Sequence, residues 1–197
     1  MMSLDEAAKQ TGEYSIPENP LQTDFTKISN EFLYQDYLER YFEWYGWNVV
    51  REVRPGQTEY RADLLVEHNE LGWFGIETKY TNRGGRKMAE AHHQIVTKYR
   101  NKMYFGHRIN KWIYAPFYEF LKNDSYKEWM DEEYLMGLTQ DFFQRNGIGY
   151  LNPISMTIQF ERGNSDTYIG IKKHHRYDPD INEINRVVKK RMNQYRY

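Results

Sequence analysis

Two short runs of strand-forming residues, at 60–66 and 73–80, flank a polar connection and predict a β-hairpin. Folding about Glu70 places Asp63 directly opposite Glu77. Opposed side chains on paired strands have Cβ atoms roughly 4.5–5.5 Å apart, and like charges at that distance repel. This pair of carboxylates therefore needs a partner of opposite charge.

Side chains of a strand alternate between its two faces, so Lys79 shares a face with Glu77. The opposite face of the hairpin is apolar and suits a core: Leu64, Val66, Phe74 and Ile76. Hard divalent cations take oxygen ligands, so a bound cation would explain why two carboxylates face each other. Two acids and one lysine backed by an apolar row form the layout of a metal-dependent phosphodiesterase site.

The length of 197 residues fits one domain, which we expect at 25–197 behind a flexible N-terminal arm at 1–24. There is no cysteine, which excludes disulfides and cysteine-ligated zinc and favours a cytoplasmic location. No apolar run reaches the roughly 18 residues of a membrane span, and no secretory signal stands at the start.

Hydrophobic periodicity and turn residues predict an α/β domain, a central mixed sheet with helices on its faces. The first expected helix begins at Asp24 or Thr26 and ends before Gly46. The others lie at 86–104, 117–130, 133–145 and 180–195. The expected strands outside the hairpin lie at 48–54, 111–115, 148–151, 154–161 and 167–171. Aromatic residues crowd the first helix, and a core explains them better than base stacking.

Asp63 on one strand and Glu77-Thr78-Lys79 on the next, with a helix before and after, resemble the PD-(D/E)xK nuclease superfamily. The resemblance covers about residues 26–160 and implies a restriction endonuclease-like core, as in RecB-like and Holliday-resolvase-like members. It also points to Glu31 on the first helix.

The helix after the lysine offers Gln94, which RecB-like members carry in the same place. The sequence differs from the family pattern at two positions. Ala62, not proline, precedes Asp63. RecB-like members have a tyrosine four residues after the glutamine, where this chain has Lys98, with Tyr99 one residue later.

The resemblance implies a bound Mg²⁺ or Mn²⁺, held by Asp63, Glu77 and the backbone carbonyl of Thr78. Such an ion can align a phosphate, activate water and offset charge on oxygen. Lys79 would orient or activate the attacking water. Glu31 and Gln94 complete the expected catalytic set, although each also fits an ordinary polar position on a helix.

Positive charge follows the acid cluster, since residues 79–111 carry nine Lys or Arg and one acid. A total net charge of −1 argues against a non-specific nucleic-acid coat, so the basic segments point to local phosphate contacts. The candidate nucleic-acid-binding residues are Arg83, Arg86, Lys87, Lys98, Lys172 and Lys173. The alternative is that these residues form solvated basic faces.

These observations predict a Mg²⁺-dependent deoxyribonuclease, most simply an endonuclease. RNA stays open as a substrate, and so does a homodimer with two active sites. The alternative is a non-catalytic nucleic-acid-binding or assembly protein that retains the nuclease fold, since fold does not fix function.

Overall fold

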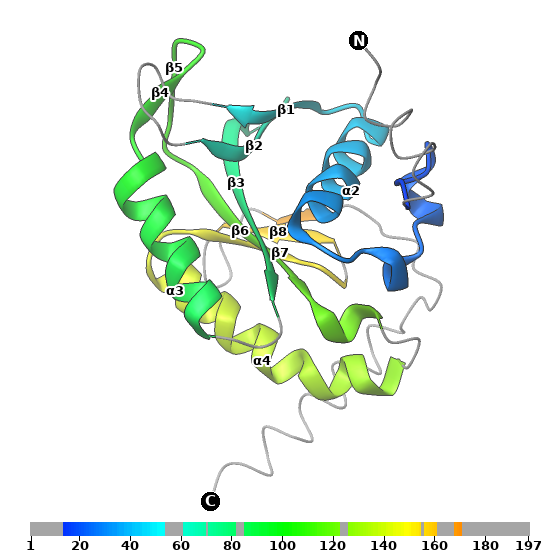
Figure 1. The fold of residues 1–197 in the computed structure, drawn as a ribbon. Coiled ribbons are helices and arrows are strands. Elements are labelled where there is room, and N and C mark those ends of the chain that lie inside the picture. Colours follow the sequence, from blue (N-terminus) through cyan, green and yellow to red (C-terminus); the bar gives the residue numbers. More distant parts are fainter. Residues whose placement is uncertain are drawn as a thin grey trace, which may run out of the picture.

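The computed structural model describes residues 14–53, 61–69, 71–81, 85–122, 126–154, 156–160 and 168–170, with no side-chain detail at 52–53, 126–133 and 168–170. A seven-stranded sheet runs through the domain in the order β1-β2-β3-β6-β7-β8-β9 (Figure 1). Its strands are β1 (Asn48–Val53), β2 (Ala62–His68), β3 (Gly72–Thr81), β6 (Trp112–Tyr118), β7 (Gly149–Asn152), β8 (Thr157–Gln159) and β9 (Tyr168–Gly170).

The sheet is mixed, as predicted. Strands β1, β2 and β3 pair antiparallel, β6 runs parallel to both β3 and β7, and β7, β8 and β9 are antiparallel again. The predicted register of the hairpin is confirmed, because Leu64 pairs with Ile76 and Val66 with Phe74. The mixed α/β architecture is thus established, with β3 in its interior.

One face of the sheet is covered by helix α2 (Glu31–Trp44), which Figure 1 shows alongside the β1–β3 end. Asn30 caps the helix by accepting a hydrogen bond from the Leu33 N–H at 2.9 Å. The predicted start at 24–26 is too early, because Asp24 caps a separate 3₁₀ turn, Phe25–Lys27, instead. The aromatic side chains of α2 do form core, with Tyr34, Tyr37, Tyr41 and Phe42 buried.

The other face carries α3 (Gly85–His93), the π-helical turn η3 (Gln94–Tyr99) and α4 (Tyr126–Arg145). A second core cluster fills this side, built on Trp112, Tyr114 and Phe143. The predicted helix at 86–104 is therefore too long. After η3 the chain forms a small separate hairpin, β4 (Lys102–Tyr104) and β5 (His107–Ile109).

Two further predictions of helix boundaries are wrong. The strand expected at 111–115 continues through Pro116 to Tyr118, and the expected helix at 117–130 is replaced by a 3₁₀ turn, Glu119–Lys122. Pro116 is tolerated because β6 pairs with β7 only at Ile113 and Tyr114, before the proline. A single helix, α4, takes the place of the two expected ones.

The part of the predicted arm that the structure describes, 14–24, lies against the domain. Ile16 is buried in the core at 2% exposure, and Pro20 is also buried. The predicted helix at 180–195 lies outside the described residues. Among the helices that the structure describes, none combines the length and the apolar character needed to cross a membrane.

Candidate active site

Asp63 is held in place by the neighbouring strand. The ladder between β2 and β3 pairs Leu64 with Ile76, and Asp63 is the next residue outward. Its Oδ2 accepts hydrogen bonds from both the backbone N–H and the Oγ1 of Thr78, each at 2.8 Å. Gln35 on α2 in turn donates from Nε2 to the Thr78 hydroxyl at 2.9 Å. The Asp63 carboxylate is thus fixed at the edge of the hairpin, half-buried.

The Lys79 ammonium lies close to two carboxylates, which come from different elements. Its Nζ lies 2.5 Å from Glu77 Oε1 and 3.6 Å from Glu31 Oε1. The other oxygen of Glu31, Oε2, accepts a hydrogen bond from the Tyr80 N–H at 3.3 Å. The first residue of α2 therefore reaches the strand that carries the glutamate and the lysine, as the resemblance implies.

The site is more enclosed than the sequence indicates. Glu77 is 0% exposed and the Lys79 side chain 5%, whereas the Glu31 side chain is 35% exposed. The face of the hairpin that carries the acids does not lie open, because α3 and η3 pack over this side of the sheet. Glu31 and the half-buried Asp63 connect the cluster to solvent.

The electrostatics of the cluster show an excess of negative charge. Burial, and next to it the charge of Asp63, raise the pKa of Glu77 to about 8 despite the neighbouring Lys79. Burial alone would lower the pKa of Lys79, but Glu77, Glu31 and Asp63 together raise it above its usual value. Three carboxylates share the cluster with one ammonium, so full ionisation of the cluster would leave two negative charges uncompensated.

These residues fit a hard divalent cation. Within the described part of the chain, no group of three or more His, Asp or Glu side chains is arranged to hold a metal by itself. The donor set that the resemblance implies is smaller, two carboxylates and the Thr78 carbonyl. Glu77 Oε2 is buried without a hydrogen-bond partner, and a buried carboxylate oxygen is satisfied by a donor or a cation. One dication also matches the charge excess.

The π-helical turn η3 brings Gln94 and Tyr99 together. The Gln94 Nε2 lies 3.5 Å from the Tyr99 hydroxyl, and the Arg100 N–H closes the turn on the Ile95 carbonyl five residues back. Burial first, and then the charges of Glu77 and Asp63, raise the pKa of the Tyr99 phenol. The charges of the acids therefore act on Tyr99. The π-helical turn brings residues five apart together, as an ordinary α-helical turn does for residues four apart.

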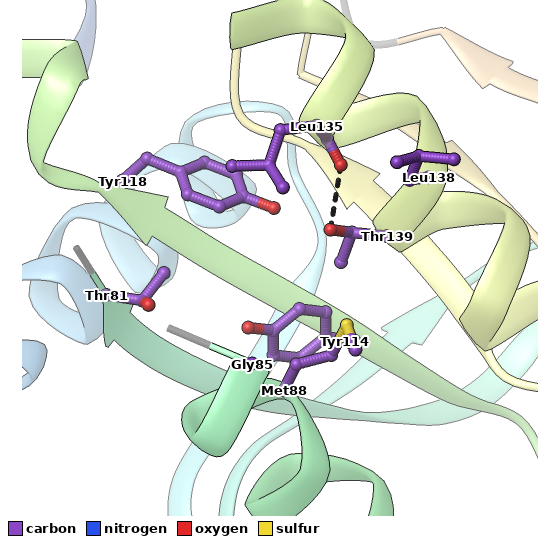
Figure 2. A pocket seen from close by; sticks show the side chains of 8 residues that line it. All are labelled: Thr81, Gly85, Met88, Tyr114, Tyr118, Leu135, Leu138 and Thr139. Atoms are coloured by element: carbon purple, nitrogen blue, oxygen red, sulfur yellow. Dashed lines mark hydrogen bonds between the residues drawn. The ribbon is translucent and has the colours of Figure 1, made fainter. Parts of the chain in front are cut away.

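A cavity of about 210 Å³ lies on the face of β3 that also carries Glu77 and Lys79 (Figure 2). Thr81, two residues beyond Lys79, and Tyr114, paired with Glu77, line it from the sheet. Apolar side chains from α3 and α4 close the other side: Met88, Leu135 and Leu138. The cavity is a mostly apolar neighbour of the acid cluster and contains none of its charged groups.

The predicted phosphate-binding residues separate into two groups. Arg86 and Lys87 are exposed on α3, where Lys87 forms an ion pair with Glu90 at 3.5 Å, and Lys98 is half-buried on η3. The other three lie outside the described residues: Arg83, Lys172 and Lys173.

Sequence reasoning missed Gln35 and the part played by the Thr78 side chain. Gln35 is buried at 7% exposure and lies one helical turn after Glu31, on the same face of α2. That spacing is a readable signal, since a polar residue four positions from a candidate site residue faces the same neighbours. The Thr78 hydroxyl lies between Gln35 and Asp63, which sequence spacing does not reveal.

Comparison with family models, with curated proteins and with solved structures finds no match to this chain. What the site can do therefore follows from its own geometry.

Proposed function

We propose that the protein is a Mg²⁺- or Mn²⁺-dependent nuclease with a restriction endonuclease-like core, which hydrolyses phosphodiester bonds of DNA as an endonuclease. The observation that supports this best is the convergence of Glu31, Asp63 and Glu77 around Lys79, with one Glu77 oxygen buried and unpartnered. The carboxylates outnumber the single lysine and can bind a divalent cation. The cation and the lysine can then both contact a phosphate.

The bound ion would supply Lewis-acid stabilisation of the charge that develops on phosphate oxygens. Asp63 and Glu77 would hold it together with the Thr78 carbonyl. Thr78 orients Asp63 through two hydrogen bonds of 2.8 Å to Oδ2, and Gln35 holds the Thr78 hydroxyl through a third of 2.9 Å.

Lys79 has a different task. In this structure its ammonium is bound to Glu77. If Glu77 binds a cation, the Lys79 ammonium can donate a hydrogen bond to a phosphate oxygen or to the attacking water instead. Its raised pKa keeps Lys79 charged near neutral pH, which suits a donor more than a base. The Glu31 side chain, 35% exposed, would face the approaching substrate.

DNA is the partner that the charge distribution favours. Residues 79–111 carry a net charge of +8 and include the two exposed basic residues of α3, Arg86 and Lys87. Neutralised phosphates release counterions, so binding should weaken steeply as salt rises.

Two variants test the proposal. Asp63→Asn keeps an oxygen that can accept from Thr78 but removes the charge, and Lys79→Met keeps the length of the side chain. Both should fold as the wild type does and lose metal-dependent cleavage. Glu67→Gln, on the same strand as Asp63 but hydrogen-bonded to Asn48, is the matched control and should cleave normally.

The assay offers supercoiled, linear, single-stranded and branched DNA, and a matching RNA, with Mg²⁺, with Mn²⁺ or with a chelator. Cleavage of supercoiled or branched DNA that needs the metal and disappears in both site variants is the expected result. Cleavage at the wild-type rate by Asp63→Asn and Lys79→Met would refute the site assignment, and preference for RNA would change the substrate.

The closed Lys79–Glu77 pair favours one second candidate, a non-catalytic nucleic-acid-binding or assembly protein that retains the fold. In that case the buried pair would be a structural element and would take no metal. Calorimetric titration with Mn²⁺ distinguishes the two candidates. A nuclease binds the ion and loses it in Glu77→Gln, whereas the alternative gives no heat of binding with either protein.

A further inference from the structure

The tip of the β4–β5 hairpin carries an unusual residue. Tyr104 pairs with His107, so Phe105 and Gly106 form a two-residue turn, with φ of 49° and 79°. Turns of this kind favour Asn-Gly, because a residue with a Cβ is disfavoured at positive φ. Phe105 is also 62% exposed, the highest fraction among the large apolar side chains of the described residues. Neither backbone preference nor core packing explains a phenylalanine there.

The tip is a firm apolar projection. Met103, on the strand before the turn, is 47% exposed, and the ring of Trp73 lies 6.4 Å from Phe105 and 6.0 Å from His107. Tyr104 anchors the hairpin, since it is 1% exposed and its ring lies 6.0 Å from Trp112. Phe105 is thus presented to solvent from a well-packed base.

The basic residues of the hairpin and its flanking chain indicate the partner. Residues 91–118 contain five Lys or Arg and no Asp or Glu. Two of these residues, Lys102 and Arg108, stand exposed on the two strands of the hairpin. An exposed aromatic ring between basic side chains matches a polymer of stacked bases and phosphates.

The hairpin lies on the same side of the sheet as the candidate active site. Trp73 and Glu77 share a face of β3 and are four residues apart, a distance of roughly 13 Å along the strand. Figure 1 shows β4 and β5 standing beyond α3 at the rim of the domain.

We propose that this hairpin is a wedge that inserts Phe105 between neighbouring base pairs of DNA bound at the candidate active site. Lys102 and Arg108 contact the flanking phosphates. Apolar side chains that enter a base step in this way unstack and bend the duplex. The inference rests on the proposed action on DNA and adds a mode of binding to it.

The test uses Phe105→Asn in the full chain, with chelator present so that the DNA stays intact. Asparagine suits the turn, so urea unfolding should show a variant at least as stable as the wild type. Affinity for duplex DNA should fall roughly tenfold, the effect of one lost base–aromatic stack. A 2-aminopurine placed in the duplex should brighten with wild-type protein and stay quenched with the variant.

Trp44→Gln is the matched control, because Trp44 is 52% exposed at the end of α2, on the other face of the sheet. It should leave both DNA signals unchanged. Equal affinity and equal 2-aminopurine signal for Phe105→Asn and wild type would overturn the wedge while leaving cleavage intact. If wild type unstacks the base but never cleaves with Mn²⁺, the wedge stands and the nuclease proposal fails.

One rival partner is an anionic membrane surface. Binding to phosphatidylserine-containing vesicles that requires Phe105, with DNA binding unaffected by the substitution, would also overturn the wedge.

Discussion

Replacement of Glu77 by glutamine should change how the stability of the protein depends on pH. Burial raises the pKa of this carboxyl from 4.5 to about 8. Between these values the folded protein holds a proton that the unfolded chain has lost, so stability is full below pH 4.5 and is lost as pH rises through 8. The free energy of unfolding should fall by about 1.4 kcal/mol per pH unit in this window.

The total is on the order of 5 kcal/mol, a large share of the 5–15 kcal/mol by which domains are usually stable. Glu77→Gln keeps the shape of the side chain and mimics its protonated form at every pH. The variant should therefore match wild type at pH 5 and exceed it at pH 8 when no metal is present. Urea unfolding with chelator at pH 5, 6, 7 and 8 measures this difference.

A divalent cation should narrow the difference in stability between wild type and Glu77→Gln at pH 8 by about half. It binds the ionised carboxylate of the folded wild type, and an ion at 100 times its dissociation constant adds about 2.7 kcal/mol. Glu77→Gln should gain little from the same Mn²⁺. Glu67→Gln, also on the hairpin, is the control and should respond to Mn²⁺ as wild type does.

The opposite result at pH 8 would refute the reasoning. If Glu77→Gln is less stable than wild type with chelator present, the ion pair with Lys79 outweighs the cost of burying the charge. A wild-type stability that stays flat between pH 5 and 8 would likewise show that Glu77 ionises as an exposed carboxyl does.

Three substitutions in β3 give further predictions. Thr78→Val removes the hydroxyl bonded to Asp63 and should cost about 1–3 kcal/mol in urea unfolding and weaken Mn²⁺ binding roughly 10- to 100-fold by calorimetry. Thr81→Val is its matched control, because the Thr81 hydroxyl is buried without a partner, and should be neutral or stabilising. Gly75→Ala should lower the thermal midpoint by several degrees, since a Cβ there would overlap the ring of Trp112.

The β2–β3 hairpin could be predicted from sequence because two strong local signals agree. Period-two alternation defines the faces, and the turn between the strands defines the register, so Leu64 and Ile76 are paired as expected. The position of Asp63 beside the strand of Glu77 follows from that register. Glu31 was found only through the family resemblance, because its contact with Lys79 joins residues 48 positions apart in the chain.

The enclosure of the site could not be predicted in the same way. Alternation shows that Glu77 and Lys79 share a face, but not that a second layer of helices covers it. The predicted ends of two helices were also wrong, for local reasons. Asp24 and Asn30 are both good caps, and only packing shows that α2 begins at the second one. The stretch at 101–109 continues the helical spacing, although the turn at Phe105 and Gly106 makes it a hairpin.

The spacing of Gln94 and Tyr99 shows how backbone geometry can hide a contact between two side chains. In an α-helix each residue turns by 100°, so a residue five positions on lies about 140° from the first, on nearly the opposite face. The π-helical turn absorbs the extra residue, and the two side chains come within 3.5 Å. Such turns carry a cost that packing must offset, and they occur often at functional sites. The extra residue therefore does not separate Gln94 from Tyr99, and a count of positions alone would have rejected a contact that the fold makes.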